Sequence, residues 1–391
     1  MLKSNNFQNL GRAATSIQSS TYVALTDRWR TMNWFLNDGP VLAHIWDRVK
    51  WYNCPKYFIT PNYPCHLEVE ASAACQMKCP MCAQGKMFEK GIQMGNMNMD
   101  LFKKIVDEVH DKVYSIKLSW RGEPSLNPHL HEMIRYAKFD KNMKSVAFLT
   151  NLERYDEKML DDLLTTGANF ISVSFDGMKE TYEKIRYPAI FEETVEKIKY
   201  LRRRRDELGL KRPLIRVQSI FSAIRNDPEE FLDFWEPIVD RVNYIVDQWR
   251  SSLDQDDYDL DPNYVCYTPW TRIAVGWNGT VALCKSDYNE GMVMGDLNIQ
   301  SVHEVWHGKK FRAIRAAMRE GTRLKYSKPC QTCSDGAKKT VGEEIEVHGR
   351  KISVKVNEGR KVDATKLDGK SNVWKKGARS KRNISRAAIS D

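Results

Sequence analysis

Short apolar runs alternate with longer amphipathic segments over the first two thirds of the chain. Runs typical of strands lie at 66–72, 115–120, 145–150, 170–175, 214–221 and 242–249. Between them, apolar residues recur at three- and four-residue spacing, which predicts helices, at 99–110, 156–167, 192–208 and 228–239. Six strand–helix units predict an α/β fold, with a parallel sheet curved into a barrel or partial barrel and helices outside it. Functional side chains are then expected at the carboxyl ends of the strands.

The pattern changes after residue 250. An acidic stretch at 253–263 lacks the central Gly and terminal Glu of a calcium loop, so we interpret it as a solvated linker. Segment 271–284 predicts two strands around Asn278-Gly279, a strong hairpin signal. A Ser-x-x-Glu capping box then predicts a helix over 302–321. Together these elements predict a small C-terminal module of a β-hairpin and a helix.

These changes predict four parts: a helical extension at 1–60, the barrel at 61–250, the module at 251–340, and a tail at 341–391. The chain has 391 residues and a net charge of +10, and most of that charge lies near its end. Residues 338–391 hold 15 Lys and Arg against seven Asp and Glu. We expect a basic, partly disordered tail that aids solubility, and no nucleic acid partner, because the chain lacks an RNA-binding signature.

Mean hydropathy is −0.56, and no run of about 20 apolar residues is present, so a membrane span is not expected. The first residues also lack the apolar core of a secretion signal. We therefore expect a cytoplasmic protein. In that reducing compartment, clustered cysteines bind metals or take part in catalysis more often than they form disulfides.

The nine cysteines fall into two informative groups. The first group is packed into eight residues and comprises Cys75, Cys79 and Cys82. The second comprises Cys266, Cys284, Cys330 and Cys333. Thiolates suit zinc or iron–sulfur clusters, but a structural zinc site needs four ligands, whereas three thiolates leave one iron of a four-iron cluster open. The second group could close either a zinc site or a complete cluster.

The motif Cys75-x3-Cys79-x2-Cys82 after the first predicted strand resembles the signature of the radical S-adenosylmethionine (SAM) superfamily. This resemblance implies a partial (β/α)6 TIM-like barrel, and a 4Fe-4S cluster on these cysteines that binds SAM at its open iron. Arg121-Gly122-Glu123-Pro124 resembles the family's Gly-Gly-Glu-Pro motif, with Arg in place of the first Gly. The other SAM-binding positions that the resemblance implies, or that we expect to line the same pocket, are Met81, Asn151, Ser174, Arg186 and Gln218.

The second cysteine group is similar to the auxiliary-cluster modules called SPASM and, in their shorter form, twitch. Gly279-x4-Cys284 matches their motif, and the spacing resembles that of superfamily dehydrogenases that oxidise a secondary alcohol of an aminocyclitol. The resemblance implies a second 4Fe-4S cluster on Cys266, Cys284, Cys330 and Cys333. It also implies a flavodoxin or ferredoxin as the reductant.

By this resemblance, SAM is cleaved to a 5′-deoxyadenosyl radical that removes a hydrogen atom from the substrate. We expect oxidation of a secondary alcohol in a sugar or cyclitol, with the auxiliary cluster as electron acceptor. Arg250, at the end of the sixth predicted strand, is our candidate for handling the hydroxyl proton. Three alternatives stay open: a peptide maturase, an epimerase using Cys54 or Cys65 as hydrogen donor, and a zinc-stabilised RNA-binding protein.

Overall fold

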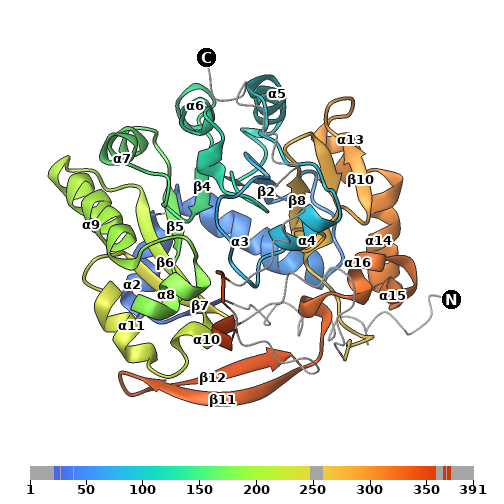
Figure 1. Ribbon diagram of the computed structural model, residues 1–391. Coiled ribbons are helices and arrows are strands. Elements are labelled where there is room, and N and C mark those ends of the chain that lie inside the picture. Colours follow the sequence, from blue (N-terminus) through green and yellow to red (C-terminus); the bar gives the residue numbers. More distant parts are fainter. Residues whose placement is uncertain are drawn as a thin grey trace.

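The computed structural model describes residues 22–26, 28–37, 39–246, 259–357, 364–366 and 368–370. Six parallel strands follow one another in the sheet: β2 (His66–Val69), β3 (Ser115–Lys117), β4 (Ser145–Thr150), β5 (Phe170–Ser174), β6 (Leu214–Ile220) and β7 (Arg241–Ile245). Figure 1 shows them as an arc with helices on its outer side. In the hydrogen-bonded order β2 and β7 are not neighbours, so the barrel stays open, and the predicted α/β partial barrel is confirmed.

The helices between these strands begin where the sequence supplies caps. Asn98, Asp156 and Asp227 each precede one of these helices and accept a backbone N–H from its first turn with the side chain. The helices that follow the strands are α4 (Gln84–Glu89), α5 (Met99–Val109), α6 (Leu130–Arg135), α7 (Glu157–Leu164), α8 (Lys179–Ile185), α9 (Phe191–Glu207), α10 (Phe221–Ile224) and α11 (Pro228–Trp235). Apolar residues of α5 to α11 pack on the sheet and belong to one core cluster with it.

The sheet extends beyond the barrel at both edges. β1 (Tyr22–Ala24) pairs antiparallel with β7, so the N-terminal segment supplies a strand as well as the expected helices α2 (Arg28–Asn37) and α3 (Val41–Lys56). On the other edge, β8 (Arg272–Val275) runs parallel to β2, and β9 (Thr280–Ala282) and β10 (Val293–Asp296) follow antiparallel. The predicted turn joins β8 and β9, with Gly279 at φ 88°. The C-terminal module therefore continues the barrel sheet.

The single helix predicted over 302–321 is wrong, because it breaks into α13 (Val302–Trp306) and α14 (Lys309–Glu320). Gly308 between them is extended (φ −65°, ψ 164°) and caps α14. A Cβ there would lie 3.1 Å from two carbonyl oxygens of α13, so the glycine permits a tight corner. The remaining short helices of the module are α12 (Thr268–Thr271), α15 (Arg323–Tyr326) and α16 (Lys328–Gln331).

A two-stranded hairpin follows the module. It consists of β11 (Lys339–Val347) and β12 (Arg350–Asn357), so its first strand begins just before the predicted start of the tail. In Figure 1 the hairpin runs from the module towards α10 and α11. Arg225 pairs with Glu343 at 3.0 Å, and His348 lies 2.8 Å from Asp233. The hairpin thus links the module to the far edge of the barrel. Among the described residues, no helix is long and apolar enough to cross a bilayer.

Candidate functional site

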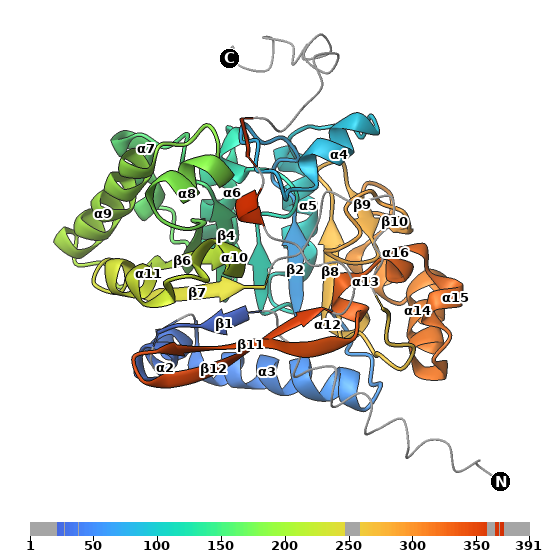
Figure 2. The ribbon, with the colours of Figure 1, turned by 60° about the horizontal axis from the view of Figure 1, so that its bottom comes forward.

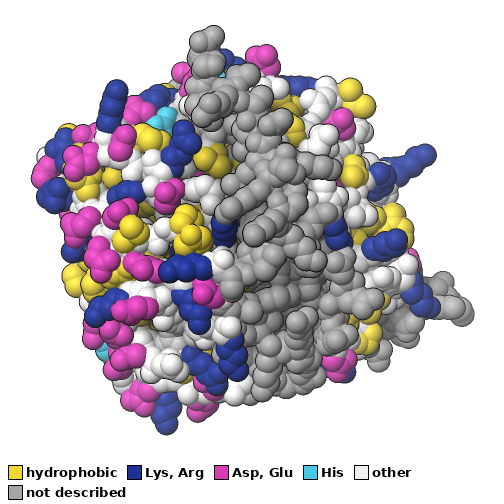
Figure 3. All heavy atoms as spheres, in the orientation of Figure 1, with side chains coloured by type: hydrophobic (Ala, Val, Ile, Leu, Met, Phe, Trp, Pro, Cys, Tyr) yellow, Lys and Arg dark blue, Asp and Glu magenta, His cyan; other side chains and the backbone are white. Residues whose placement is uncertain are grey.

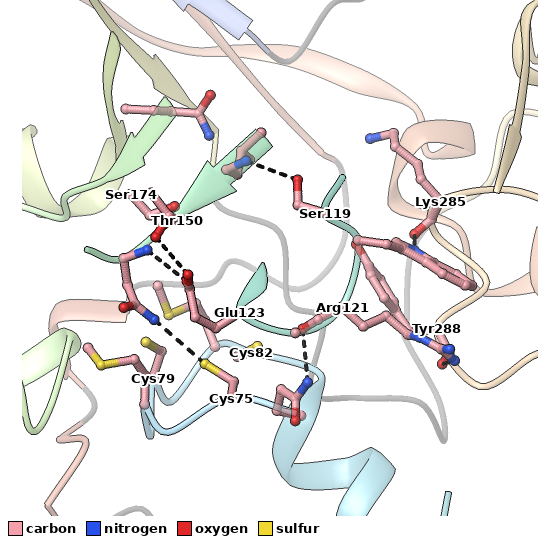
Figure 4. A pocket seen from close by; sticks show the side chains of 18 of the residues that line it. Cys75, Cys79, Cys82, Ser119, Arg121, Glu123, Thr150, Ser174, Lys285 and Tyr288 are labelled. Atoms are coloured by element: carbon pink, nitrogen blue, oxygen red, sulfur yellow. Dashed lines mark hydrogen bonds between the residues drawn. The ribbon is translucent and has the colours of Figure 1, made fainter. Parts of the chain in front are cut away.

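The first cysteine group lies in the loop that follows β2, at the carboxyl end of the strand. Cys75, Cys79 and Cys82 border one cavity, as Figure 4 shows. Buried Gln84 holds the loop, because its side-chain amide donates to the carbonyl oxygens of Ala73 (2.5 Å) and Arg121 (2.9 Å). Burial raises the pKa of Cys75 well above its usual value, and Glu123 and the two neighbouring thiols act in the same direction. Burial, with a smaller contribution from Cys82, raises the pKa of Cys79 to about 11. The three cysteines therefore lie close together at one cavity.

The second wall of the cavity is the turn after β3. A Cβ on Gly122 would lie 2.3 Å from the carbonyl oxygen of Ser72, so only glycine permits this close approach to the cysteine loop. Glu123 is buried and accepts hydrogen bonds from the Thr150 hydroxyl (2.7 Å) and the Asn151 backbone (2.9 Å). Burial raises the pKa of Glu123 above its usual value, and these hydrogen-bond donors oppose this shift only in part. Pro124 is buried in the short helical turn that follows. A carboxylate held this way is fixed at the cavity wall.

The ends of β4, β5 and β6 supply further predicted residues. Asn151, which follows β4, places its side-chain nitrogen 3.8 Å from the Sγ of Cys75. Ser174, the last residue of β5, borders the same cavity. Gln218 of β6 is buried there and accepts a hydrogen bond from Asn243 at 3.3 Å. These three positions meet as the rule for parallel strands predicts.

Two predicted residues lie beside the cysteines themselves. Met81 borders the cavity and packs against the core. Arg186, at the end of α8, places a guanidinium nitrogen 3.8 Å from the Sγ of Cys79. It also pairs with buried Asp176 at 2.5 Å, which holds the guanidinium in place. Arg186 lowers the pKa of Cys79 against the larger effect of burial. The arginine is thus positioned to balance negative charge at this corner.

The four cysteines of the second group also come together, although they are spread over 68 positions from 266 to 333. Burial raises the pKa of the Cys284 thiol well above its usual value, and the thiols of Cys333, Cys266 and Cys330 raise it further. Burial likewise raises the pKa of Cys330 to about 11. Arg323 braces this region by donating to the carbonyl oxygens of Tyr264 (3.0 Å) and Cys330 (3.3 Å). The module therefore gathers four mutually interacting thiols.

Arg121 has a role that sequence reasoning missed. Its guanidinium is fully buried and bonds Glu70 at 2.5 Å and 2.7 Å. It also reaches Glu290 (2.8 Å) and the carbonyl oxygen of Tyr288 (3.1 Å) in the loop after Cys284. The substituted position of the Arg-Gly-Glu-Pro motif thus ties the Glu123 turn to the module. The departure from the family's glycine was the signal that could have directed attention to it.

A further part of the cavity wall was also not predicted. It is lined by Ser119 and Trp120, which follow β3, and by Lys285 and Tyr288 of the module, as Figure 4 shows in part. The Trp120 indole donates to the carbonyl oxygen of Lys285 at 2.7 Å, next to Cys284. Deeper in the wall, Glu68 pairs with Lys117 at 2.8 Å. This part of the wall brings polar groups and two aromatic side chains, Trp120 and Tyr288, to the cavity.

The other cysteines and the expected base lie elsewhere. Arg250 falls outside the described residues, so its place relative to the cavity stays a prediction. Cys54 in α3 and Cys65 before β2 are both buried, and neither borders the cavity. Burial raises the pKa of Cys65 to about 12 and also raises that of Cys54. Both therefore behave as small core residues, which disfavours them as hydrogen donors.

The residues present fit the groups that the family resemblance implies. Three thiols, a nearby guanidinium and a buried carboxylate surround one cavity, and soft thiolates are the usual ligands of iron–sulfur clusters. Among the described residues, no three His, Cys, Asp or Glu side chains are grouped to hold a single metal ion. A four-iron cluster is bound by thiolates that need not converge on one atom. Cys75, Cys79 and Cys82 would hold one cluster, and the four module cysteines a second.

Comparison with known families agrees with this arrangement. Residues 69–211 match the radical SAM superfamily, and residues 266–334 match SPASM, an iron–sulfur cluster-binding domain. The first match contains the three-cysteine loop, the Glu123 turn and Arg186. The second contains all four module cysteines. Each cysteine group thus lies inside a family domain of its own.

Individual relatives are distant. The S-adenosyl-L-methionine-dependent 2-deoxy-scyllo-inosamine dehydrogenase of Niallia circulans is 23% identical over 69% of this chain and 92% of its own length. The tungsten-containing aldehyde ferredoxin oxidoreductase cofactor-modifying protein of Pyrococcus furiosus is 28% identical over 40% of this chain and 43% of its own. Among solved structures, Streptococcus suis SuiB bound to precursor peptide SuiA has a TM-score of 0.50 at 12% identity. That alignment covers 76% of this chain and 81% of SuiB, and it supports the fold alone.

Proposed function

Because this chain carries a radical SAM domain followed by a SPASM domain, we propose that it is an oxidoreductase acting on a small hydroxylated molecule. The reaction is the oxidation of a secondary alcohol of a sugar or cyclitol to a ketone. The Niallia circulans relative, which spans 92% of its length on this chain, is a dehydrogenase and supports this class. The observation that carries the proposal is one cavity bordered by the three-thiol group and by Lys285 and Tyr288 of the module, where Lys285 directly follows Cys284.

The SAM-binding cluster and SAM, when bound, supply hydrogen-atom abstraction, and the auxiliary cluster supplies an electron acceptor. Oxidation removes a hydrogen atom from the carbinol carbon, a proton from its hydroxyl, and one further electron. The chain's own residues orient the reactants: Glu123 is fixed to receive an ammonium group, and Arg186 to receive a carboxylate. Ser174 stands at the same rim as a further hydroxyl donor.

The substrate would lie between Trp120 and the thiols, where Ser119 and Lys285 can bind hydroxyl groups. Lys285 directly follows Cys284. A substrate bound to the ammonium group of Lys285 would therefore lie beside the auxiliary site. Arg250 stays our candidate for the hydroxyl proton, acting by electrostatic stabilisation of an alkoxide, since a guanidinium is a poor base. The expected reductant is a flavodoxin or ferredoxin.

A reducing compartment, the cytoplasm in our proposal, fits the thiols of the chain. All nine cysteines are free in the structure, so none is withdrawn into a disulfide. An oxidising compartment would expose both groups to disulfide formation before clusters could assemble.

An anaerobic assay with candidate sugars, cyclitols and peptides tests the proposal. We expect 5′-deoxyadenosine together with a ketone from one cyclitol or sugar, and neither product from the Cys79→Ala variant. Modification of a peptide instead would assign the chain to the maturases. Protein that binds zinc without iron would support the non-enzymatic alternative.

A further inference from the structure

The helix α3 has an inverted pattern of burial. Its buried side chains include the polar residues His44 and Asp47, together with Cys54. Its exposed face is apolar, with Leu42 at 83% and Trp46 at 63% exposure. The exposed large apolar side chains of α3 are Val41, Leu42, Ile45, Trp46, Val49 and Tyr52. A surface helix normally shows the reverse arrangement, and a clustered apolar surface of this kind marks an interaction site.

The exposed residues form one stripe along α3. Successive residues of a helix are turned by about 100°, so Leu42, Ile45, Trp46 and Val49 fall within one sector of roughly 100° of the helix surface. The preceding helix α2 carries a similar row at three- and four-residue spacing: Trp29, which is 70% exposed, with Met32 and Leu36. The two helices are in contact, and we call their exposed apolar residues together the α2–α3 surface.

Basic residues flank this stripe. On the same projection, Arg48 lies at one edge of the stripe and Lys50 at the other, and Lys56 stands at its C-terminal end. The only acid in α3 is Asp47, which is buried and bonded to Arg48. With Arg48 balanced by Asp47, Lys50 and Lys56 leave net positive charge along the exposed surface. The barrel helices visible at the left in Figure 3 differ, because Lys and Arg alternate there with Asp and Glu.

We propose that the α2–α3 surface docks the protein on an anionic lipid bilayer, with both helices lying in the interface. An apolar stripe with Trp and Tyr, bordered by long basic side chains, is the pattern of interfacial helices. The stripe enters the acyl boundary, while the ammonium groups extend to the headgroup phosphates. A second copy of the chain fits less well, because pairing two such stripes would bring Lys and Arg of one copy against those of the other.

The place of the surface in the fold suits this role. In Figure 2, α2 and α3 lie at one end of the molecule, and α4, which follows the cysteine loop, lies at the opposite end. Docking through α3 would leave the cysteine loop facing away from the lipid. The proposed docking and the proposed catalytic function are independent of each other.

Sedimentation of the full-length holoprotein with lipid vesicles tests the proposal. Vesicles of equimolar phosphatidylcholine and phosphatidylglycerol are compared with vesicles of phosphatidylcholine alone. The variants are Trp46→Ser, which removes apolar contact, and Lys50→Glu, which reverses one flanking charge. The control is Ile299→Ser, since Ile299 is also 82% exposed but follows β10 in the module. Thermal unfolding verifies that all four proteins are folded.

We expect binding to the anionic vesicles, with a partition coefficient about tenfold lower for Trp46→Ser and several-fold lower for Lys50→Glu. Ile299→Ser should bind like the parent protein. The proposal is overturned if the protein does not sediment with anionic vesicles, or if both α3 variants bind unchanged, which would assign binding to the basic tail. It is also overturned if light scattering shows a dimer that Trp46→Ser dissociates while lipid binding is absent.

Discussion

Among the cysteines, the environment of the thiol separates candidate ligands from core residues. Cys79 faces the Arg186 guanidinium and shares a cavity with two further thiols. Cys65 is as buried, but it faces Asp47 and Cys54 and lies away from the cavity. Two buried cysteines therefore have different neighbours, and substitutions of Cys79 and Cys65 can be compared directly.

We predict that Cys79→Ala abolishes SAM cleavage, because two remaining thiolates cannot hold the cluster that activates SAM. Cys65→Ala should retain cleavage and lose only some stability. Anaerobic detection of 5′-deoxyadenosine by chromatography measures both. Cleavage at the parent rate by Cys79→Ala would remove this cysteine from the site.

Gly122 gives a second residue-scale test. An added Cβ would meet backbone atoms of Ser72, Ala73 and Ala74, which cannot move aside as a flexible side chain could. We predict that Gly122→Ala displaces the Glu123 turn, lowers the free energy of unfolding by about 1–3 kcal/mol, and weakens SAM binding. The matched control is Gly85→Ala in α4, where an added Cβ meets nothing within 4 Å.

Urea unfolding and calorimetric titration with SAM measure both effects of the glycine substitutions. Gly85→Ala should match the parent or be slightly more stable, since alanine is the better helix former. Tight SAM binding by a stable Gly122→Ala protein would show that this turn does not contact SAM.

At the scale of elements, the module is joined to the barrel by more than the β2–β8 ladder. Arg121, in the turn after β3, bonds Glu70 after β2 and Glu290 in the loop between β9 and β10. Its side chain is 1% exposed, so removing the charge leaves Glu70 buried without its partner. Breaking a buried ion pair in this way typically costs about 3–5 kcal/mol.

We therefore predict that Arg121→Gln destabilises the protein and increases amide hydrogen exchange in residues 285–290. Arg205→Gln is the control, because Arg205 is also a buried arginine, but it pairs with Asp240 on the outer side of the barrel. It should destabilise without changing exchange in residues 285–290. Equal exchange in both variants would mean that Arg121 does not hold the module loop.

The module cysteines lead to a different expectation from those of the loop after β2. We predict that Cys284→Ala still forms 5′-deoxyadenosine but no longer yields oxidised product, because the electron acceptor is lost while the SAM site is intact. Chromatography of nucleoside and product in the same reaction measures the two separately. Persistent turnover to product would refute the acceptor role of the module.

The elements also show how far the sequence could lead. The predicted strands at 145–150 and 170–175 agree with β4 and β5 to within one residue, because buried parallel strands are short, continuous apolar runs. The helix over 302–321 was predicted as one piece, since its apolar spacing continues across Gly308 while the backbone turns. The local sequence pattern predicts helical periodicity, but it does not show the close backbone contacts at Gly308 that end one helix and start the next.

For the site, the residues that form motifs were found and those that join distant segments were not. The Cys75 loop and the Glu123 turn are recognisable because their chemistry is local in the chain. The partners of Arg121 and the wall residue Lys285 come from segments far apart in sequence, and only the folded sheet brings them together. The β1 strand was missed for the same reason, because three residues acquire strand structure only by pairing with β7.

At the scale of the whole molecule, one ten-stranded sheet carries both cysteine groups. The three-thiol loop follows β2, and the module begins with β8, which pairs directly with β2. Neighbouring strands therefore bring the module next to the cavity, which the three loop thiols border together with Lys285 and Tyr288 of the module. In the function that we propose, this shared sheet would link hydrogen abstraction at the first group to electron acceptance at the second.

The most direct measurement is metal and sulfide analysis, with electron paramagnetic resonance, of anaerobically reconstituted protein and of a variant with all three loop cysteines replaced by alanine. We predict about eight irons for the full-length protein and about four for the variant, with SAM changing the spectrum of the parent protein only. Zinc in place of iron, or a variant that keeps the full iron content and its response to SAM, would contradict the account.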